Sequence, residues 1–316
     1  MSELVIETSG LRKSYRHGLR RRVAVDGLDL AVPAGGVHGF LGPNGSGKTT
    51  TMRMLLGLAR PDKGVARVFG LKVPSQLPQV VDRVGAVIGS PGFSPHLSGR
   101  TNLQLVGRTL GLSRTGVDEV LHQVGLESRA RSSYASYSPG MRQRLAIAAA
   151  LLKTPDLLLL DEPTAGLGPA GGRTVRDLVR RLGDGGTTVL LSSHNLVEVQ
   201  QLCHSVSVID HGRLLASGRV DELLGERTSR TRVKVADLRG AQHVLRSAGR
   251  TVARDGDALL VEGHERPEEI TRALAARGHY VTELIEVRPD LESVFLQLTG
   301  RAPDGSSTPT PADGER

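Results

Sequence analysis

The sequence Gly42-Pro43-Asn44-Gly45-Ser46-Gly47-Lys48-Thr49-Thr50 decides the fold of this chain. It follows a short apolar run at residues 37–41, which predicts a buried strand, and it precedes residues 51–56, which predict the start of a helix. A Gly-x4-Gly-Lys-Thr pattern in that setting is typical of a phosphate-binding loop. The glycines let backbone N–H groups approach a phosphate chain, and the N-terminus of the helix adds partial positive charge.

Polar side chains are expected to gather around this loop. Lys48 would reach the β- and γ-phosphates of a nucleotide, and the Thr49 hydroxyl would bind Mg²⁺. A four-leucine run at residues 157–160 ends in Asp161 and Glu162, which places both acids at the ligand edge of a parallel sheet. Asp161 suits Mg²⁺ opposite Thr49, and Glu162 could polarise an attacking water. The alternative is a pair of acids in a solvated loop.

Three further residues are candidates for nucleotide contacts. His194 follows the predicted strand 188–191 and could bind a γ-phosphate or the attacking water, although a lone histidine is more often a capping or core residue. Ser138 and Gly140 begin a predicted helix, where an exposed N-terminus is an anion site or an ordinary capped helix end. Tyr15 lies between the first two predicted strands, 4–8 and 23–32, where it could stack on a base or simply pack.

The composition is that of an ordinary globular protein. A length of 316 residues favours two domains, and 38% hydrophobic content allows a substantial core. No apolar run reaches the roughly 18–20 residues that span a bilayer, and no secretory signal is expected. The single Cys203 fits a reducing cytoplasm and predicts a small buried hydrophobe.

The net charge of +8 would suit nucleic acid or an anionic membrane surface. The alternative is an arginine-rich composition with its charge spread out, because only Arg20-Arg21-Arg22 forms a basic block.

The second half of the chain predicts a separate α+β domain. The composition becomes polar around residues 223–232, a plausible boundary. Beyond it we expect strands at 231–235, 251–253, 258–261 and 280–287, and helices at 238–248 and 267–277. This β-α-β-β-α-β order is that of a ferredoxin-like unit. A last helix is expected at 291–298, and residues 301–316 predict a disordered tail.

Together, these motifs resemble the nucleotide-binding subunit of ATP-binding-cassette (ABC) transporters, over roughly residues 4–225. Within that family the chain is most similar to the daunorubicin and bacitracin resistance type of bacterial exporter. The resemblance implies an α/β cassette at 1–225 with a helical insertion at about 90–152, and an accessory domain at 226–300. It implies ATP and Mg²⁺ as cofactors.

The resemblance also assigns roles to single residues. Tyr15 becomes the adenine-stacking aromatic, Gly42 to Thr50 the Walker A loop and Asp161 the Walker B acid. Glu162 becomes the catalytic base and His194 the switch histidine. The segment from Tyr137 to Met141 occupies the signature motif, with Ser138 and Gly140 as the phosphate-facing pair.

The partners implied are a second copy of the cassette, bound head to tail, and a separate membrane permease. The permease would contact the surface around residues 93–103 and hold the chain at the cytoplasmic face of the membrane. No nucleic acid is expected. Two other functions remain open: a soluble cassette protein acting on nucleic acid or the ribosome, which the basic charge favours slightly, and a regulatory cassette with weak hydrolysis.

Three departures from the family pattern bear on hydrolysis. The signature has Tyr137, Pro139 and Met141 where the family usually has Leu, Gly and Gln. Gly89 stands at the Q-loop position, where the family has Gln or Glu near Mg²⁺ and the attacking water. Gly168 stands in the D-loop, where the family has Asp. We therefore expect binding with slower or partner-dependent hydrolysis.

Overall fold

The computed structural model describes residues 3–17, 20–89, 91–111, 114–224, 230–263, 267–287 and 291–299. The chain forms two compact units, one of residues 1–220 with the chain from Phe295 onward, and one of residues 221–294. The predicted disordered tail, 301–316, lies outside the described residues.

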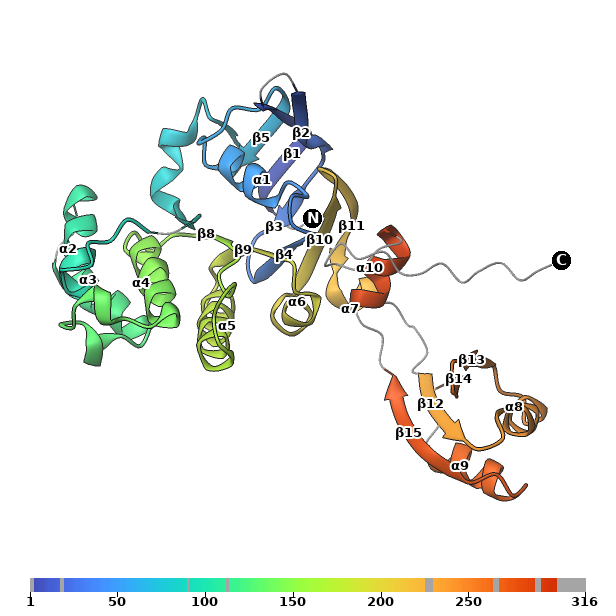
Figure 1. Cartoon of the computed structure of the whole chain (residues 1–316). Helices are drawn as coiled ribbons and strands as arrows, with labels where there is room; N and C mark the ends of the chain where they lie inside the picture. The colour runs from blue at the N-terminus through green and yellow to red at the C-terminus, as the bar shows by residue number, and fades with distance from the viewer. Residues whose placement is uncertain are drawn as a thin grey trace. The chain divides into compact units, whose positions relative to one another are not determined.

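A six-stranded sheet in the order β11-β10-β4-β9-β8-β7 forms the centre of the first unit (Figure 1). Neighbouring strands from β10 to β7 are parallel, and β11 is antiparallel to β10. Strands β4, β8 and β9 are almost entirely buried because both faces of a parallel sheet are covered, and β8 is a run of four leucines before Asp161. The strands are β4 (Val37–Leu41), β7 (Val84–Val87), β8 (Leu157–Asp161), β9 (Thr188–Ser193), β10 (Ser205–Asp210) and β11 (Arg213–Arg219).

An antiparallel sheet packs beside it. Its order is β2-β1-β5-β6, and β3 also pairs with β1. These strands are β1 (Leu4–His17), β2 (Arg20–Leu28), β3 (Ala31–Pro33), β5 (Lys63–Val68) and β6 (Leu71–Val73).

The first strand is longer than predicted. The placement of Tyr15 between two strands was wrong, because β1 continues to His17 and pairs with β2 from Leu11 to His17. The predicted strand 23–32 is in fact two strands, β2 and β3. Residues 12–16 are mostly polar and carry no apolar alternation, so pairing with β2, rather than the local pattern, makes them a strand.

Helix α1 (Lys48–Leu55) lies between the two sheets. Its Met52, Met54 and Leu55 are buried in one cluster with residues of both sheets, such as Ile6 and Leu159. On the other face, α5 (Pro169–Asp184) contacts β4 and β9, and α6 (Leu196–Leu202) contacts β4. The phosphate loop therefore lies at the carboxyl edge of the parallel sheet, directly before a helix held in the core.

The predicted helical insertion is present. It contains α2 (Gly99–Thr109), α3 (Arg114–Gln123) and α4 (Pro139–Leu151), which contact one another. Short 3₁₀ turns flank it or lie within it, at Leu77–Gln79, Val81–Arg83, Glu127–Arg129 and Tyr134–Ser136. Ser138 caps α4 as predicted: its Oγ accepts a hydrogen bond from the Met141 N–H at 3.3 Å, and Pro139 takes the first helical position.

The second unit has the predicted β-α-β-β-α-β order. Its sheet runs β13-β14-β12-β15, with every neighbouring pair antiparallel, and this arrangement supports a ferredoxin-like unit. Its core gathers apolar residues such as Val233, Leu245 and Leu274 from the strands and helices. The elements are β12 (Arg230–Val235), α8 (Leu238–Ser247), β13 (Val252–Asp255), β14 (Ala258–Glu262), α9 (Pro267–Ala275) and β15 (Val281–Val287). Two short helices, α7 (Val220–Leu224) and α10 (Leu291–Thr299), precede and follow them.

Candidate functional site

The phosphate loop is fixed by close backbone packing at its glycines. Gly47 caps α1 with a φ of 111°, and a Cβ there would lie 2.5 Å from the Ala24 carbonyl oxygen. A Cβ at Gly42 would lie 2.3 Å from the Ile209 carbonyl oxygen. No side chain fits at either distance, so both positions require glycine. The loop is thus held between β2 and the end of β10.

Lys48 is buried at the centre of this loop. Its Nζ donates hydrogen bonds to the Gly42 carbonyl at 2.6 Å and the Pro43 carbonyl at 3.2 Å, and lies 3.4 Å from Glu162 Oε1. Burial lowers the pKa of Lys48, while the negative charges of Glu162 and Asp161 oppose that shift. The ammonium group is therefore held over the loop by carbonyl oxygens and one carboxylate.

Asp161 and Thr49 meet across the sheet edge as the sequence predicted. The Thr49 hydroxyl donates to Asp161 Oδ2 at 2.7 Å, and the Ser192 hydroxyl donates to Asp161 Oδ1 at 2.6 Å. Asp161 and Ser192 are register partners on β8 and β9, which explains their proximity. A threonine hydroxyl and a carboxylate are oxygen ligands of the kind that Mg²⁺ prefers, so this pair fits the expected metal.

Glu162 connects the two strand ends. Its backbone has a φ of 49°, which is uncommon for a residue with a side chain, and its N–H donates to Ser192 Oγ at 2.9 Å. Its Oε2 lies 2.8 Å from His194 Nδ1. Its Oε1 is buried and has no hydrogen-bond partner among the described residues. One carboxylate oxygen is thus held by His194, and the other is paired with the ammonium group of Lys48.

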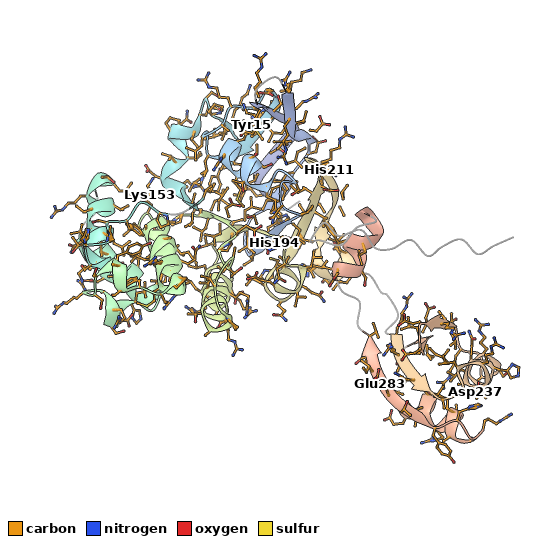
Figure 2. The ribbon with its side chains drawn as sticks, viewed as in Figure 1. Tyr15, Lys153, His194, His211, Asp237 and Glu283 are labelled. Carbon is orange, nitrogen blue, oxygen red and sulfur yellow. The ribbon has the colours of Figure 1, made fainter. Side chains whose placement is uncertain are left out.

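His194, labelled in Figure 2, follows β9. Its side chain is 45% exposed, so it is not a core histidine. The backbone there turns into α6, which Asn195 caps by accepting a hydrogen bond from the Glu198 N–H at 3.0 Å.

A pocket of about 430 Å³ opens on this cluster. Tyr15, which is 41% exposed, lies on the β1–β2 hairpin (Figure 2) and lines the pocket. The structure thus brings an aromatic ring, the loop and Glu162 to one cavity. Its lining residues are Tyr15, Arg16, Arg22, Ala24, Asn44, Gly45, Gly47, Lys48, Thr49, Thr50 and Glu162.

Ser138 and Gly140 do not line this pocket. Ser138 is exposed at the N-terminus of α4, whereas Gly140 is buried. A Cβ on Gly140 would lie 3.1 Å from Gly171 Cα, so α4 and α5 approach each other closely there. Within one chain, the structure does not bring the predicted signature residues to the loop.

The structure gives a physical reason for Tyr137, one of the departures in the signature segment. Tyr137 is buried, and its hydroxyl donates to the Arg129 carbonyl at 2.8 Å. A Cβ on Gly99 would lie 2.2 Å from the Tyr137 hydroxyl, so the larger side chain fits because residue 99 is glycine. Burial also raises the pKa of Tyr137, which keeps the phenol neutral.

Sequence reasoning assigned no role to two residues that support the site. Ser192 bridges Asp161 and the Glu162 backbone. Glu198 is buried on α6 and accepts a hydrogen bond from the Thr164 hydroxyl at 2.8 Å, which ties the segment after Glu162 to the helix after His194. Their positions in the sequence could have suggested these roles. Ser192 lies near the end of a strand beside Asp161, and Glu198 lies about one helical turn after His194.

Comparison with known proteins agrees with this geometry. Residues 25–165 match the model of the ABC transporter family. The chain is 44% identical to the daunorubicin/doxorubicin resistance ATP-binding protein of Streptomyces peucetius, over 98% of this chain and 97% of that protein. This chain belongs to the ABC transporter family. The bacitracin transport ATP-binding protein of Enterococcus faecalis is 36% identical, over 94% of this chain and 97% of that protein.

The cassette fold is confirmed as well. The structure of cbiO1 from Clostridium perfringens, part of the ABC transporter complex cbiONQ, superposes with a TM-score of 0.64. It is 26% identical and covers 71% of this chain and 92% of that one. The family predicted from the motifs, and with it the ATPase class, is therefore correct for this cassette.

Proposed function

We propose that this cassette is the ATP-binding and ATP-hydrolysing subunit that powers export of a small compound through a separate membrane permease. The observation that carries the proposal is the cluster of Lys48, Thr49, Asp161, Glu162 and His194 beside one pocket. A lysine for phosphates, an oxygen pair for Mg²⁺ and a carboxylate beside the lysine are what phosphoryl transfer to water requires.

Each residue then has a defined task. Tyr15 stacks on adenine, and the backbone N–H groups of the loop hold the phosphates. Lys48 exchanges its carbonyl partners and Glu162 Oε1 for the β- and γ-phosphates, which releases that carboxylate oxygen. Glu162 Oε1 accepts a hydrogen bond from the attacking water and orients it toward the γ-phosphate. His194 holds Glu162 Oε2. Thr49 and Asp161 would hold Mg²⁺, which neutralises phosphate charge when bound.

The site is completed by a second copy of the cassette. Ser138 and the N-terminus of α4 supply an exposed, capped helix end that its own loop does not use. In a head-to-tail dimer, this helix end would face the γ-phosphate on the opposite loop, and the two copies would bind two nucleotides between them.

The membrane partner is expected beside the Q-loop position. None of the described helices is long and apolar enough to cross a membrane. A pocket of about 410 Å³ lies between β7 and α4, and its lining includes Gly89, Phe93 and Val106. A permease loop seated there would touch both the parallel sheet and the helical insertion, and it would hold the cassette at the cytoplasmic face.

The two relatives suggest the class of cargo. One is named for resistance to daunorubicin and doxorubicin, and the other for bacitracin transport. We infer that the compound exported here is small and amphiphilic.

Isolation of the tagged chain from detergent-solubilised membranes tests the proposal. We expect a protein with several membrane spans to copurify, and we expect ATPase activity that Glu162→Gln abolishes. The charge-matched surface variant Glu262→Gln, in the second unit, should keep that activity. Recovery of RNA or ribosomal proteins instead, with binding that falls steeply with salt, would contradict the proposal.

A further inference from the structure

Arg22 lies over the phosphate loop. Its Nη2 atom is only 2.9 Å from the position that a Cβ on Gly45 would occupy. It is the register partner of Tyr15 across the β1–β2 hairpin, and directly opposed residues of an antiparallel pair project to the same side of the sheet. Arg22, Tyr15 and Gly45 all line the nucleotide pocket. The guanidinium group thus lies against the loop at Gly45, in the same pocket as the Tyr15 side chain.

The neighbouring Arg21 behaves differently. Its Nε donates to the Ser14 hydroxyl at 2.7 Å, and its Nη2 lies 3.3 Å from Asp62 Oδ2. Arg21 does not line the pocket. Within the described part of the chain, the side chain of Arg22 makes no hydrogen bond or ion pair. Arg21 is therefore bound to a carboxylate outside the site, whereas the N–H donors of Arg22 face the pocket.

We infer that Arg22 binds the phosphate chain of the nucleotide. The inference rests on the proposed nucleotide site and adds a cation that the phosphate-loop motif does not contain. A guanidinium group offers five N–H donors in a planar fork that matches phosphate oxygens. At Gly45 the loop has no side chain, so nothing separates the fork from a phosphate lying on the loop N–H groups.

A phosphate role is favoured over stacking on the base. Tyr15 already provides an aromatic face in the pocket, whereas Arg22 is placed above the loop backbone, where Gly45 turns with a φ of 83°. The two roles predict different behaviour of a lysine at this position. Lysine keeps a charge for phosphate but has no plane that can stack on a base.

Equilibrium binding of ADP with Mg²⁺ to the intact chain, by titration calorimetry, separates these possibilities. We expect Arg22→Ala to raise the dissociation constant about 10-fold, in line with the loss of one charge-assisted contact. Arg22→Lys should stay within about 3-fold of the wild type, because the charge remains. Arg21→Ala is the matched control on the same strand and should bind as the wild type does. The dependence of affinity on salt should also be weaker in Arg22→Ala.

Two results would overturn the inference while leaving the cassette function intact. Arg22→Ala could bind ADP as tightly as the wild type, or Arg22→Lys could bind as weakly as Arg22→Ala, which would assign the residue to stacking. A wild-type chain that binds no ADP would instead overturn the proposed function itself. Circular dichroism of each variant establishes that it is folded.

Discussion

At the scale of single residues, Gly168 is the position where one change should raise the rate of hydrolysis. Gly168 caps α5 with a φ of −64°, and no heavy atom lies within 4 Å of a Cβ built there. Aspartate therefore fits without strain and is a good N-cap. It would add one polar contact toward the opposite cassette. We expect Gly168→Asp to raise the steady-state ATPase rate about 3- to 10-fold, as one hydrogen bond in the transition state would.

The matched control is Gly168→Asn, which caps the helix equally well without the negative charge. A rate at the wild-type level in Gly168→Asp would show that this glycine does not limit hydrolysis.

The corresponding change at Gly89 is a poorer test. Gly89 has a φ of 76°, so Gly89→Glu would add roughly 1–2 kcal/mol of backbone strain to any gain in chemistry.

The residues of the site divide into those that sequence could predict and those that it could not. Thr49, Asp161 and His194 were predictable because a loop motif and two apolar strand ends fix them to one sheet edge. Arg22 was not, because its position over Gly45 depends on the length of β1 and on its pairing with β2. The fit of Tyr137 against Gly99 was also hidden, since those residues are far apart in sequence and meet only through packing.

At the scale of elements, the N-terminus of α4 has two roles that one substitution can separate. Ser138→Ala should cost about 1 kcal/mol of stability, because the Met141 N–H loses its cap. Ser138→Asp keeps the cap, and the wild-type urea midpoint should be retained. Its negative charge would oppose the γ-phosphate of the other copy. In a Glu162→Gln background, we expect Ser138→Asp to lose the ATP-dependent dimer on gel filtration.

Retention of that dimer by Ser138→Asp would show that the α4 N-terminus does not face a phosphate across the interface. A second variant, Ser136→Asp, introduces the same charge two residues before Ser138, in the 3₁₀ turn that precedes α4. Ser136 does not cap α4, so a charge there is not placed at the helix end that we expect to face the γ-phosphate. This variant should therefore dimerise more strongly than Ser138→Asp does.

Strands and helices were predicted accurately where the sequence shows apolar runs separated by turns, and poorly where it does not. The strands and helices of the second unit were predicted closely, since short apolar runs there are separated by clear turns such as Asp255-Gly256. The β1–β2 hairpin was misjudged because its polar residues carry no alternation and are ordered by cross-strand pairing. The β1–β2 part of the antiparallel sheet beside α1 therefore could not be predicted from the local sequence pattern.

At the scale of the whole molecule, the parallel sheet carries a buried histidine that should make stability depend on pH. His38 on β4 is 3% exposed, and its ring nitrogens bond the Ser205 and Ser207 hydroxyls at 2.7 and 2.9 Å. Burial lowers the pKa of His38 to about 4. An unfolded chain has a histidine pKa near 6.5, so it binds the proton first as the pH falls.

The sign of the effect follows from this difference. The neutral, buried His38 contributes fully to the free energy of unfolding above pH ~6.5. As the pH drops from ~6.5 toward 4, this contribution falls by roughly 3 kcal/mol in all. We expect the urea midpoint, followed by circular dichroism, to fall less steeply over this range in His38→Gln than in the wild type. His243→Gln, in the second unit, is the control and should keep the wild-type slope. Equal slopes in all three chains would mean that the acid sensitivity of the molecule comes from other groups than the histidine at the centre of its sheet.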